Sequence, residues 1–318
     1  MQRVLTTVTL LGLLVATAAA FAITEHLKLI KSPIFGAEVS IGGRTNAKVF
    51  SPVCHCETST ATVQIELRRS DHVTVTIHDA EGRKVATISD RAAEPARTPI
   101  PFTWHGRMSD GSVASDGVYH PWIYLARPRH TYGLLNRISV DTKAPKVLSA
   151  TRGTSKTVFF AGPGRTVAIR YLFSEPAHAV VYLGRRQVIL GRRSRERDKV
   201  KWAGTREGRR LRAGTYVLSI GAQDIAGNET PAAERKQVTV VLRYIQLTPE
   251  RIAARAGRPF TVHVETAAPR YTWRLGKRHG SRRGRTLRLR APTTPGTYHL
   301  VVAEHTHSTT AAVRVRAK

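Results

Sequence analysis

Apolar and polar residues alternate in short runs through most of the chain after residue 34. Clear examples are residues 63–67, 73–77, 216–222, 287–290 and 313–316, and turn-forming glycine, proline, aspartate and asparagine residues separate such runs. A period of two residues is typical of strands with one buried face, and no long segment here keeps the period of a helix. The pattern predicts an all-β protein made of antiparallel β-sandwiches.

A motif of aromatic residues and glycines occurs twice. Its first copy comprises Trp104, Gly106, Gly117 and Tyr119, and its second copy comprises Trp202, Gly204, Gly214 and Tyr216. The two tyrosines lie 97 positions apart, about the length of one sandwich domain. We expect each tryptophan to pack inward at the end of a strand and each tyrosine hydroxyl to bond nearby backbone, with glycines supplying positive φ in the turns.

The first copy resembles a known family. Its tryptophan and tyrosine enclose the turn residues Asp110-Gly111 and Asp116-Gly117, and the strand sequence VTVTIHDAEGRKVATI precedes them. This arrangement is similar to the Ig-like domain of the flagellar hook-capping protein, the FlgD-like Ig domain. The resemblance covers residues 45–141 well and residues 150–242 more loosely, and residues 243–318 look only generically Ig-like. It implies an Ig-like fold and exposure on a bacterial surface, and it implies no chemistry.

These observations predict a tandem array of three Ig-like β-sandwich domains after an N-terminal transmembrane helix. The predicted segments are 1–34 for the signal anchor and juxtamembrane region, then 35–143, 146–242 and 243–318 for the three domains. The first boundary follows from the segment at 141–145, which ends in proline and favours an extended linker.

The N-terminal segment supports the predicted anchor. Residues 4–23 carry no charged side chain, and twenty such residues suffice for a helix that spans a bilayer. We predict a single-pass protein of the cell membrane with its C-terminal region extracytoplasmic. A cleaved signal peptide and a buried helix remain alternatives, because small residues at 18–22 offer cleavage sites. Lys28 and Lys31 against Arg3 favour the opposite orientation, whereas the very short N-terminal tail favours this one.

Positive charge is concentrated in the second half of the chain. The formal net charge is +29, and residues 146–318 carry +25 of it. The candidate polyanion-binding residues are Arg185, Arg186, Arg192, Arg193, Arg195 and Arg197 in one run and Arg278, Arg282, Arg283 and Arg285 in another. We expect them to bind anionic cell-envelope polymers or phospholipid headgroups, because neutralising such a polymer releases counter-ions. A merely solvated, arginine-rich surface is the alternative.

The chemistry-bearing motifs are few. Cys54, His55 and Cys56 are weak candidates for metal ligands, and the two cysteines can also form a disulfide. No nucleophile elbow or phosphate-binding loop is present, and acidic residues are sparse in the C-terminal part. The sequence therefore predicts no enzyme and no cofactor.

The leading hypothesis is a non-enzymatic adhesion or envelope-organising protein. No aromatic residues are interleaved with the basic runs, which disfavours base stacking and sequence-specific reading of single strands. Intracellular nucleic acid is disfavoured as a partner because the predicted orientation places the domains outside. It becomes the alternative if the topology is reversed. A metal- or redox-responsive surface module built on Cys54 and Cys56 is the other alternative.

Overall fold

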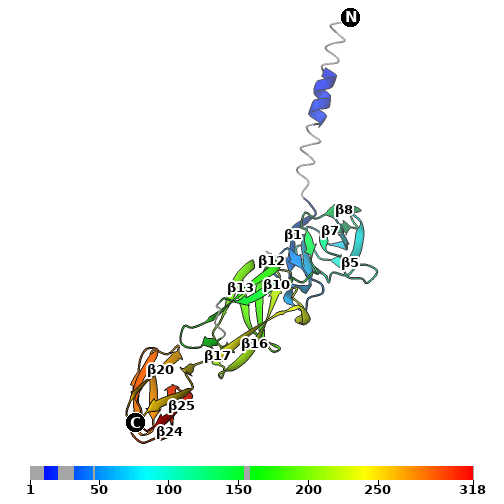
Figure 1. Cartoon of the computed structure of the whole chain (residues 1–318). Helices are drawn as coiled ribbons and strands as arrows, with labels where there is room; N and C mark the ends of the chain where they lie inside the picture. Colours follow the sequence, from blue (N-terminus) through cyan, green and yellow to red (C-terminus); the bar gives the residue numbers. More distant parts are fainter. Residues whose placement is uncertain (1–10, 21–31, 46, 154–157, 318) are drawn as a thin grey trace. The chain divides into compact units, whose positions relative to one another are not determined.

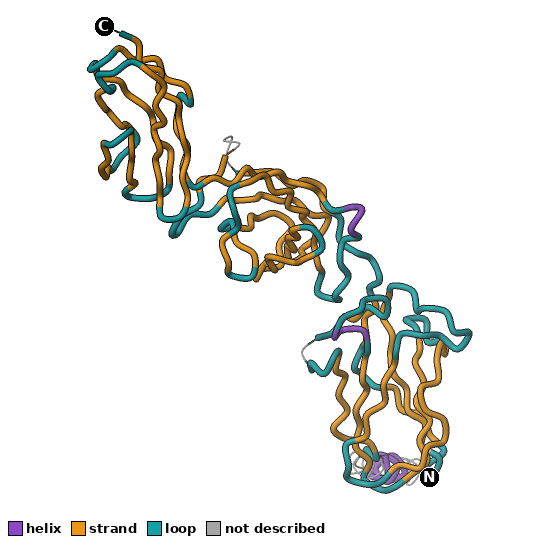
Figure 2. Tube along the Cα trace, turned by 90° about the horizontal axis from the view of Figure 1, so that it is seen from below, coloured by secondary structure: helices purple, strands orange, loops and turns teal. Residues whose placement is uncertain are grey.

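β-Strands are the main secondary structure of the chain (Figures 1 and 2). The computed structural model describes residues 11–20, 32–45, 47–153 and 158–317. Chain contacts separate it into two compact units, Met1–Thr142 and Lys143–Lys318. The predicted all-β class is thereby confirmed.

The predicted membrane anchor at residues 4–23 is described only in part. Residues 11–20 form an exposed helix, whereas residues 4–10 and 21–23 lie outside the described part of the chain. Within the residues that the structure describes, no helix is both long enough and apolar enough to cross a bilayer.

The first unit is a sandwich of two sheets. Its elements are β1 (Ile34–Ile41), β2 (Val49–Phe50), η1 (Glu57–Ser59), β3 (Ala61–Leu67), β4 (Asp71–His78), β5 (Lys84–Glu94), β6 (Ile100–Trp104), β7 (Gly117–Leu125), β8 (His130–Gly133) and β9 (Ile138–Val140). One sheet has the order β1-β3-β6, and the other has the order β2-β9-β7-β4-β5 with β8 paired to β7. Alternate residues of β3 and β4 are buried, as the sequence pattern predicts, and both sheets contribute to one core.

The second unit begins with what we call the middle sandwich. Its elements are β10 (Val147–Arg152), β11 (Val158–Phe160), β12 (Val167–Leu183), β13 (Arg186–Trp202), β14 (Thr205–Arg206), β15 (Arg209–Arg210), β16 (Gly214–Gln223), η2 (Ala232–Glu234) and β17 (Lys236–Arg243). The long strand β12 pairs with β10 and β13 through its first half and with β13 and β16 through its second half. The pairing register shifts between Leu172 and Ala177 around Pro176, where a missing N–H is tolerated. Residues of both halves, such as Tyr171 and Val181, share one core.

The C-terminal sandwich completes the second unit. Its strands are β18 (Ile245–Thr248), β19 (Arg251–Arg255), β20 (Pro259–Thr266), β21 (Tyr271–Leu275), β22 (Arg278–Arg282), β23 (Thr286–Arg290), β24 (Gly296–Glu304) and β25 (His307–Arg316). They form a three-stranded sheet, β18-β20-β23, and a five-stranded sheet, β19-β25-β24-β21-β22. A separate core lies between these sheets.

All three sandwiches begin in the same way. The first strand pairs antiparallel with its neighbour, as β1–β3, β10–β12 and β18–β20 do. The next strand then pairs in parallel with the last strand, as β2–β9, β11–β17 and β19–β25 do. It lies at an edge of the other sheet in the first and C-terminal sandwiches, and at the opposite edge of the same sheet in the middle sandwich. Because all three sandwiches share this order of antiparallel and parallel pairings, the chain is a tandem repeat.

The aromatic motif has the same geometry in both copies. The Nε1 atoms of Trp104 and Trp202 donate to the carbonyl oxygen three residues later, each at 2.9 Å. The hydroxyls of Tyr119 and Tyr216 donate to the carbonyl oxygen four residues earlier, each at 2.8 Å. Tyr298 makes the same bond in the C-terminal sandwich, at 3.0 Å. The two tryptophans therefore end strands β6 and β13. The tyrosines lie near the start of β7, β16 and β24 and hold the corners that precede these strands.

The number of compact units differs from the three predicted domains. The middle and C-terminal sandwiches have separate cores, yet they fall within one unit. Tyr244 connects them: its ring is buried and stacks on His307 at 3.7 Å, and its hydroxyl donates to the Leu211 carbonyl at 2.6 Å. Because there is no free linker at this position, the second predicted boundary is a packed junction.

A cluster in the middle sandwich predicts a pH effect on stability. The Tyr182 hydroxyl donates to Glu229, which also pairs with Arg235 at 2.8 Å, and Arg235 lies over the Tyr182 ring. Burial, together with the bond to Glu229, raises the pKa of Tyr182 to about 12. An unfolded tyrosine ionises near pH 10, so this contribution to stability is present below pH 10 and is lost as the pH rises to about 12.

We expect Tyr182→Phe to reduce the loss of stability between pH 10 and pH 12. Chemical unfolding at several pH values measures the effect, and tyrosinate absorbance should show one fewer late-ionising tyrosine. An unchanged alkaline titration in the variant would contradict the assignment.

Candidate functional site

A group of basic side chains lies on the outward face of the middle sandwich. We call it the cationic face, and its members are Arg170, Arg197, Lys199 and Lys201. Val200 and Trp202 point into the core, so the alternation of β13 places Arg197, Lys199 and Lys201 on the opposite, solvent-facing side. Arg170 of β12 lies directly across from Lys199 in the register and shares this side.

The side chains of the cationic face form no ion pair with a carboxylate in the described part of the chain. Alternate residues of one strand are about 7 Å apart, and directly opposed residues are about 5 Å apart. Like charges directly opposed in a sheet repel each other, so a bound anion would relieve an unfavourable interaction.

An open groove of about 400 Å³ runs over this face. Arg170, Arg197 and Lys199 line it, together with Asp198 of β13 and with Ser149 and Thr151 of the adjacent strand β10. The groove therefore carries three cations and one carboxylate. The register places Thr151 opposite Arg170, so hydroxyl donors and cations lie side by side across three strands. Such a surface can hold several anionic groups, each through charge and hydrogen bonds.

The other basic residues of the first predicted run are more dispersed. Arg185 lies in the turn between β12 and β13, and Arg186 pairs with Glu207 at 2.8 Å. Arg192, Arg193 and Arg195 are exposed on β13, near a shift of its register with β12. Of the run's six candidates, Arg197 alone lines the groove.

The second predicted run lies on the C-terminal sandwich. Arg278 and Arg282 begin and end β22, and Arg283 lies in the turn that follows. The Arg278 guanidinium donates to the Arg290 carbonyl at 2.9 Å. Arg285 is exposed and lines a different pocket. The fold therefore does not bring this run together with the cationic face as one groove.

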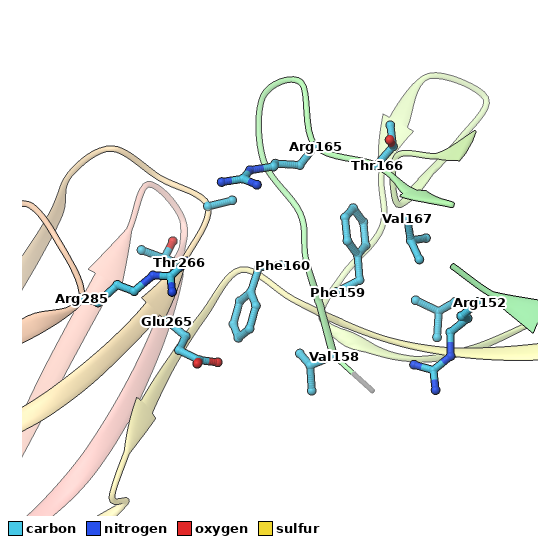
Figure 3. Close-up of a pocket in the computed structure, with 12 residues that line it drawn as sticks. Arg152, Val158, Phe159, Phe160, Arg165, Thr166, Val167, Glu265, Thr266 and Arg285 are labelled. Atoms are coloured by element: carbon cyan, nitrogen blue, oxygen red, sulfur yellow. The ribbon is translucent and has the colours of Figure 1, made fainter. Parts of the chain in front are cut away.

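That pocket, of about 220 Å³, lies in the second unit (Figure 3). Figure 3 shows the rings of Phe159 and Phe160 in the middle of the view, with Arg152, Arg165 and Arg285 on different sides of them. Glu265 also lines the pocket, so two aromatic rings, three guanidinium groups and one carboxylate surround it.

The Cys54–His55–Cys56 segment is joined by a disulfide between its two cysteines. It lies between β2 and η1, with both cysteines partly exposed and His55 exposed. Disulfide sulfur atoms carry no thiolate to coordinate a metal. Within the described ranges, no group of three or more histidine, cysteine, aspartate or glutamate side chains has the arrangement of a metal site.

Sequence reasoning missed Arg170, Ser149 and Thr151. They come from strands other than β13, and their place in the groove follows from the pairing of β10 and β13 with β12. The alternation at 197–202 was a usable signal for the face of β13, whereas the residues opposite each position required the register.

Comparison with known proteins gives a match for the first unit. Residues 51–122 match the model of the FlgD Ig-like domain. No curated protein sequence matches the chain. Among solved structures, a three-Ig segment of titin is 9% identical, with 91% of this chain and 100% of that chain covered and a TM-score of 0.32.

Two bacterial structures are also similar. The fibronectin(III)-like modules of CbhA from Clostridium thermocellum are 11% identical, with 64% of this chain and 94% of that chain covered and a TM-score of 0.35. A 1.5-MDa bacterial ice-binding adhesin is 13% identical, with 91% and 99% covered and a TM-score of 0.29. The matched segment 51–122 makes up the greater part of the first sandwich, and this part of the chain is a FlgD-like Ig domain by sequence.

Proposed function

We propose that the protein is a surface module that binds linear polyanions through the cationic face of its middle sandwich. The single observation that carries this proposal is the groove lined by Arg170, Arg197 and Lys199, which outnumber its one carboxylate, Asp198, and form no ion pair in the part of the chain that the structure describes. The FlgD-like Ig match supports the surface role, since such modules are typical of cell-surface and adhesion proteins.

The shape of the site favours a polymer. The groove is open, and its cations follow β13 at intervals of about 7 Å. A chain with regularly spaced anionic groups can occupy several of these positions at once, so that weak contacts add up. The middle sandwich supplies further exposed cations along the same strand, at Arg193 and Arg195.

The site does not favour recognition of nucleic-acid bases. Tyr171 is the aromatic residue of the groove, and its ring belongs to the core with 4% of its surface exposed. Base stacking requires an exposed aromatic face. The proposed partner is therefore recognised by its charge, as in phosphate- or carboxylate-bearing envelope polymers.

The test is the salt dependence of binding to a defined polymer. We expect long-chain polyphosphate to bind the full-length protein, and the logarithm of the association constant to fall with the logarithm of salt concentration with a slope of about −3, for three to four released counter-ions. Isothermal titration calorimetry from 50 to 200 mM salt measures it, with neutral dextran as the control polymer. Binding that ignores salt, or equal binding of dextran, would refute the proposal.

A further inference from the structure

We propose that the Cys54–Cys56 disulfide is a site of thiol–disulfide exchange that accepts electrons from a dithiol of a peptide or protein. This inference does not rest on polyanion binding, because the disulfide lies in the first unit and the cationic face lies in the second. It rests on the position of the bond, on the hydroxyl beside it and on the way its loop is held.

The disulfide constrains little of the chain. Its cysteines are separated by two positions, so the closed loop holds three residues. The entropic stabilisation from a cross-link grows with the length of the loop that it closes, and a loop this short is at the low end. The bond lies outside the strands, and neither cysteine belongs to a hydrophobic core. Stabilising the sandwich is therefore a poor explanation for it.

The loop is held in place by contacts other than the disulfide. The buried Ser51 donates its N–H to the Thr58 carbonyl at 3.2 Å, and the N–H of Gly42 donates to the Thr60 carbonyl at 3.1 Å. Pro52 packs against Gly106, where a Cβ atom would overlap it. Reduction would thus leave both sulfur atoms close together on a folded domain, ready for reoxidation.

A hydroxyl group distinguishes the two sulfur atoms. Thr58 Oγ1 lies 3.0 Å from Cys56 Sγ and 3.9 Å from Cys54 Sγ. Disulfide sulfur has no proton, so the hydroxyl is the donor, and its one hydrogen serves the nearer sulfur, Cys56 Sγ. A donor at this distance stabilises a thiolate on Cys56, which makes Cys56 the better leaving group and Cys54 the sulfur that is attacked.

The exchange proceeds in two steps. A thiolate of the partner dithiol attacks Cys54 Sγ, the Cys54–Cys56 bond breaks, and its electron pair goes to Cys56 Sγ beside the Thr58 hydroxyl. The second partner thiolate then attacks the partner sulfur of the mixed disulfide, and Cys54 leaves as a thiolate. Water supplies protons to the thiolates, so two electrons pass from the partner, which becomes a disulfide, to the cysteine pair.

The experiment follows reduction of the full-length protein by dithiothreitol, with acid quenching, alkylation and mass spectrometry. We expect Thr58→Val to slow reduction about tenfold, because a hydrogen bond to a charged group is lost. Thr60→Val is the matched control in the same loop and should react at the wild-type rate. Equal rates for the two variants would overturn the role of Thr58.

Two further measurements test the site itself. In Cys56→Ser, glutathione disulfide should form a mixed disulfide on Cys54. Reduced wild type should retain its near-ultraviolet circular dichroism and, when treated with glutathione disulfide, should regain the internal bond without lasting glutathione adducts. Loss of the folded spectrum on reduction would show a structural disulfide and overturn the proposal. Persistent glutathione adducts would show that the two cysteines do not re-form their bond, which would also overturn it.

Discussion

Replacing all four residues of the cationic face by serine is expected to weaken polyphosphate binding at least about a hundredfold in 50 mM salt. A cation near an anionic surface contributes roughly 1 kcal/mol, and each tenfold change in affinity corresponds to about 1.4 kcal/mol. The four side chains are exposed and lie outside the core, so the fold should persist. The salt slope should fall toward zero, since the counter-ions that these residues release are no longer displaced.

The matched control removes the same charge from the C-terminal sandwich. Its substitutions to serine are at Arg251, Arg255, Arg314 and Arg316, which are exposed on the paired strands β19 and β25. Both variants lower the formal net charge by four, but the control leaves the groove intact. We expect it to weaken binding only about threefold, because distant exposed charges are screened. Equal losses in the two variants would show that net charge, not the cationic face, governs binding.

The cationic face illustrates what the sequence could and could not predict. The period of two residues located the strands, and the paired motif of Trp104 and Trp202 located the repeat. Both are local signals, because burial of alternate residues and the turn chemistry of glycine act over a few positions. The charge runs were visible in the same way. However, the side of the sheet on which their arginine side chains lie is known only once the buried face of the strand is known.

The cationic face depended on pairing that local signals do not contain. Arg170 lies 29 positions before Lys199 in the sequence and directly opposite it in the sheet. The register of β12 shifts around Pro176, and only the half before this shift pairs with β10. A shift of one residue in the pairing would reverse the faces. The packed junction at Tyr244 could not be predicted from local patterns either, because the ring stacks on His307, which is distant in the sequence.

The second large expected effect is a loss of stability in the first unit, caused by a substitution beside the loop that carries the disulfide. Gly42 and Gly43 are adjacent, and both have positive φ, at 53° and 75°. A Cβ atom on Gly42 would overlap the carbonyl oxygen of Glu57, whereas one on Gly43 would meet nothing within 4 Å. Alanine at either position incurs the cost of the left-handed backbone, about 1 kcal/mol. Alanine at position 42 also forces backbone apart, which adds about 1–3 kcal/mol.

We therefore expect Gly42→Ala to destabilise the first unit by about 3 kcal/mol and Gly43→Ala by about 1 kcal/mol. Hydrogen exchange followed by mass spectrometry resolves the units, so peptides from β3 and β7 should lose protection while those from β16 and β24 stay unchanged. The neighbouring glycine is the control, because it shares the backbone strain and lacks the overlap. Equal destabilisation by the two variants would mean that backbone strain alone matters, and that the loop from Ser51 to Thr60 yields to the added methyl group. It would also weaken the argument that the loop keeps Cys54 and Cys56 together after reduction.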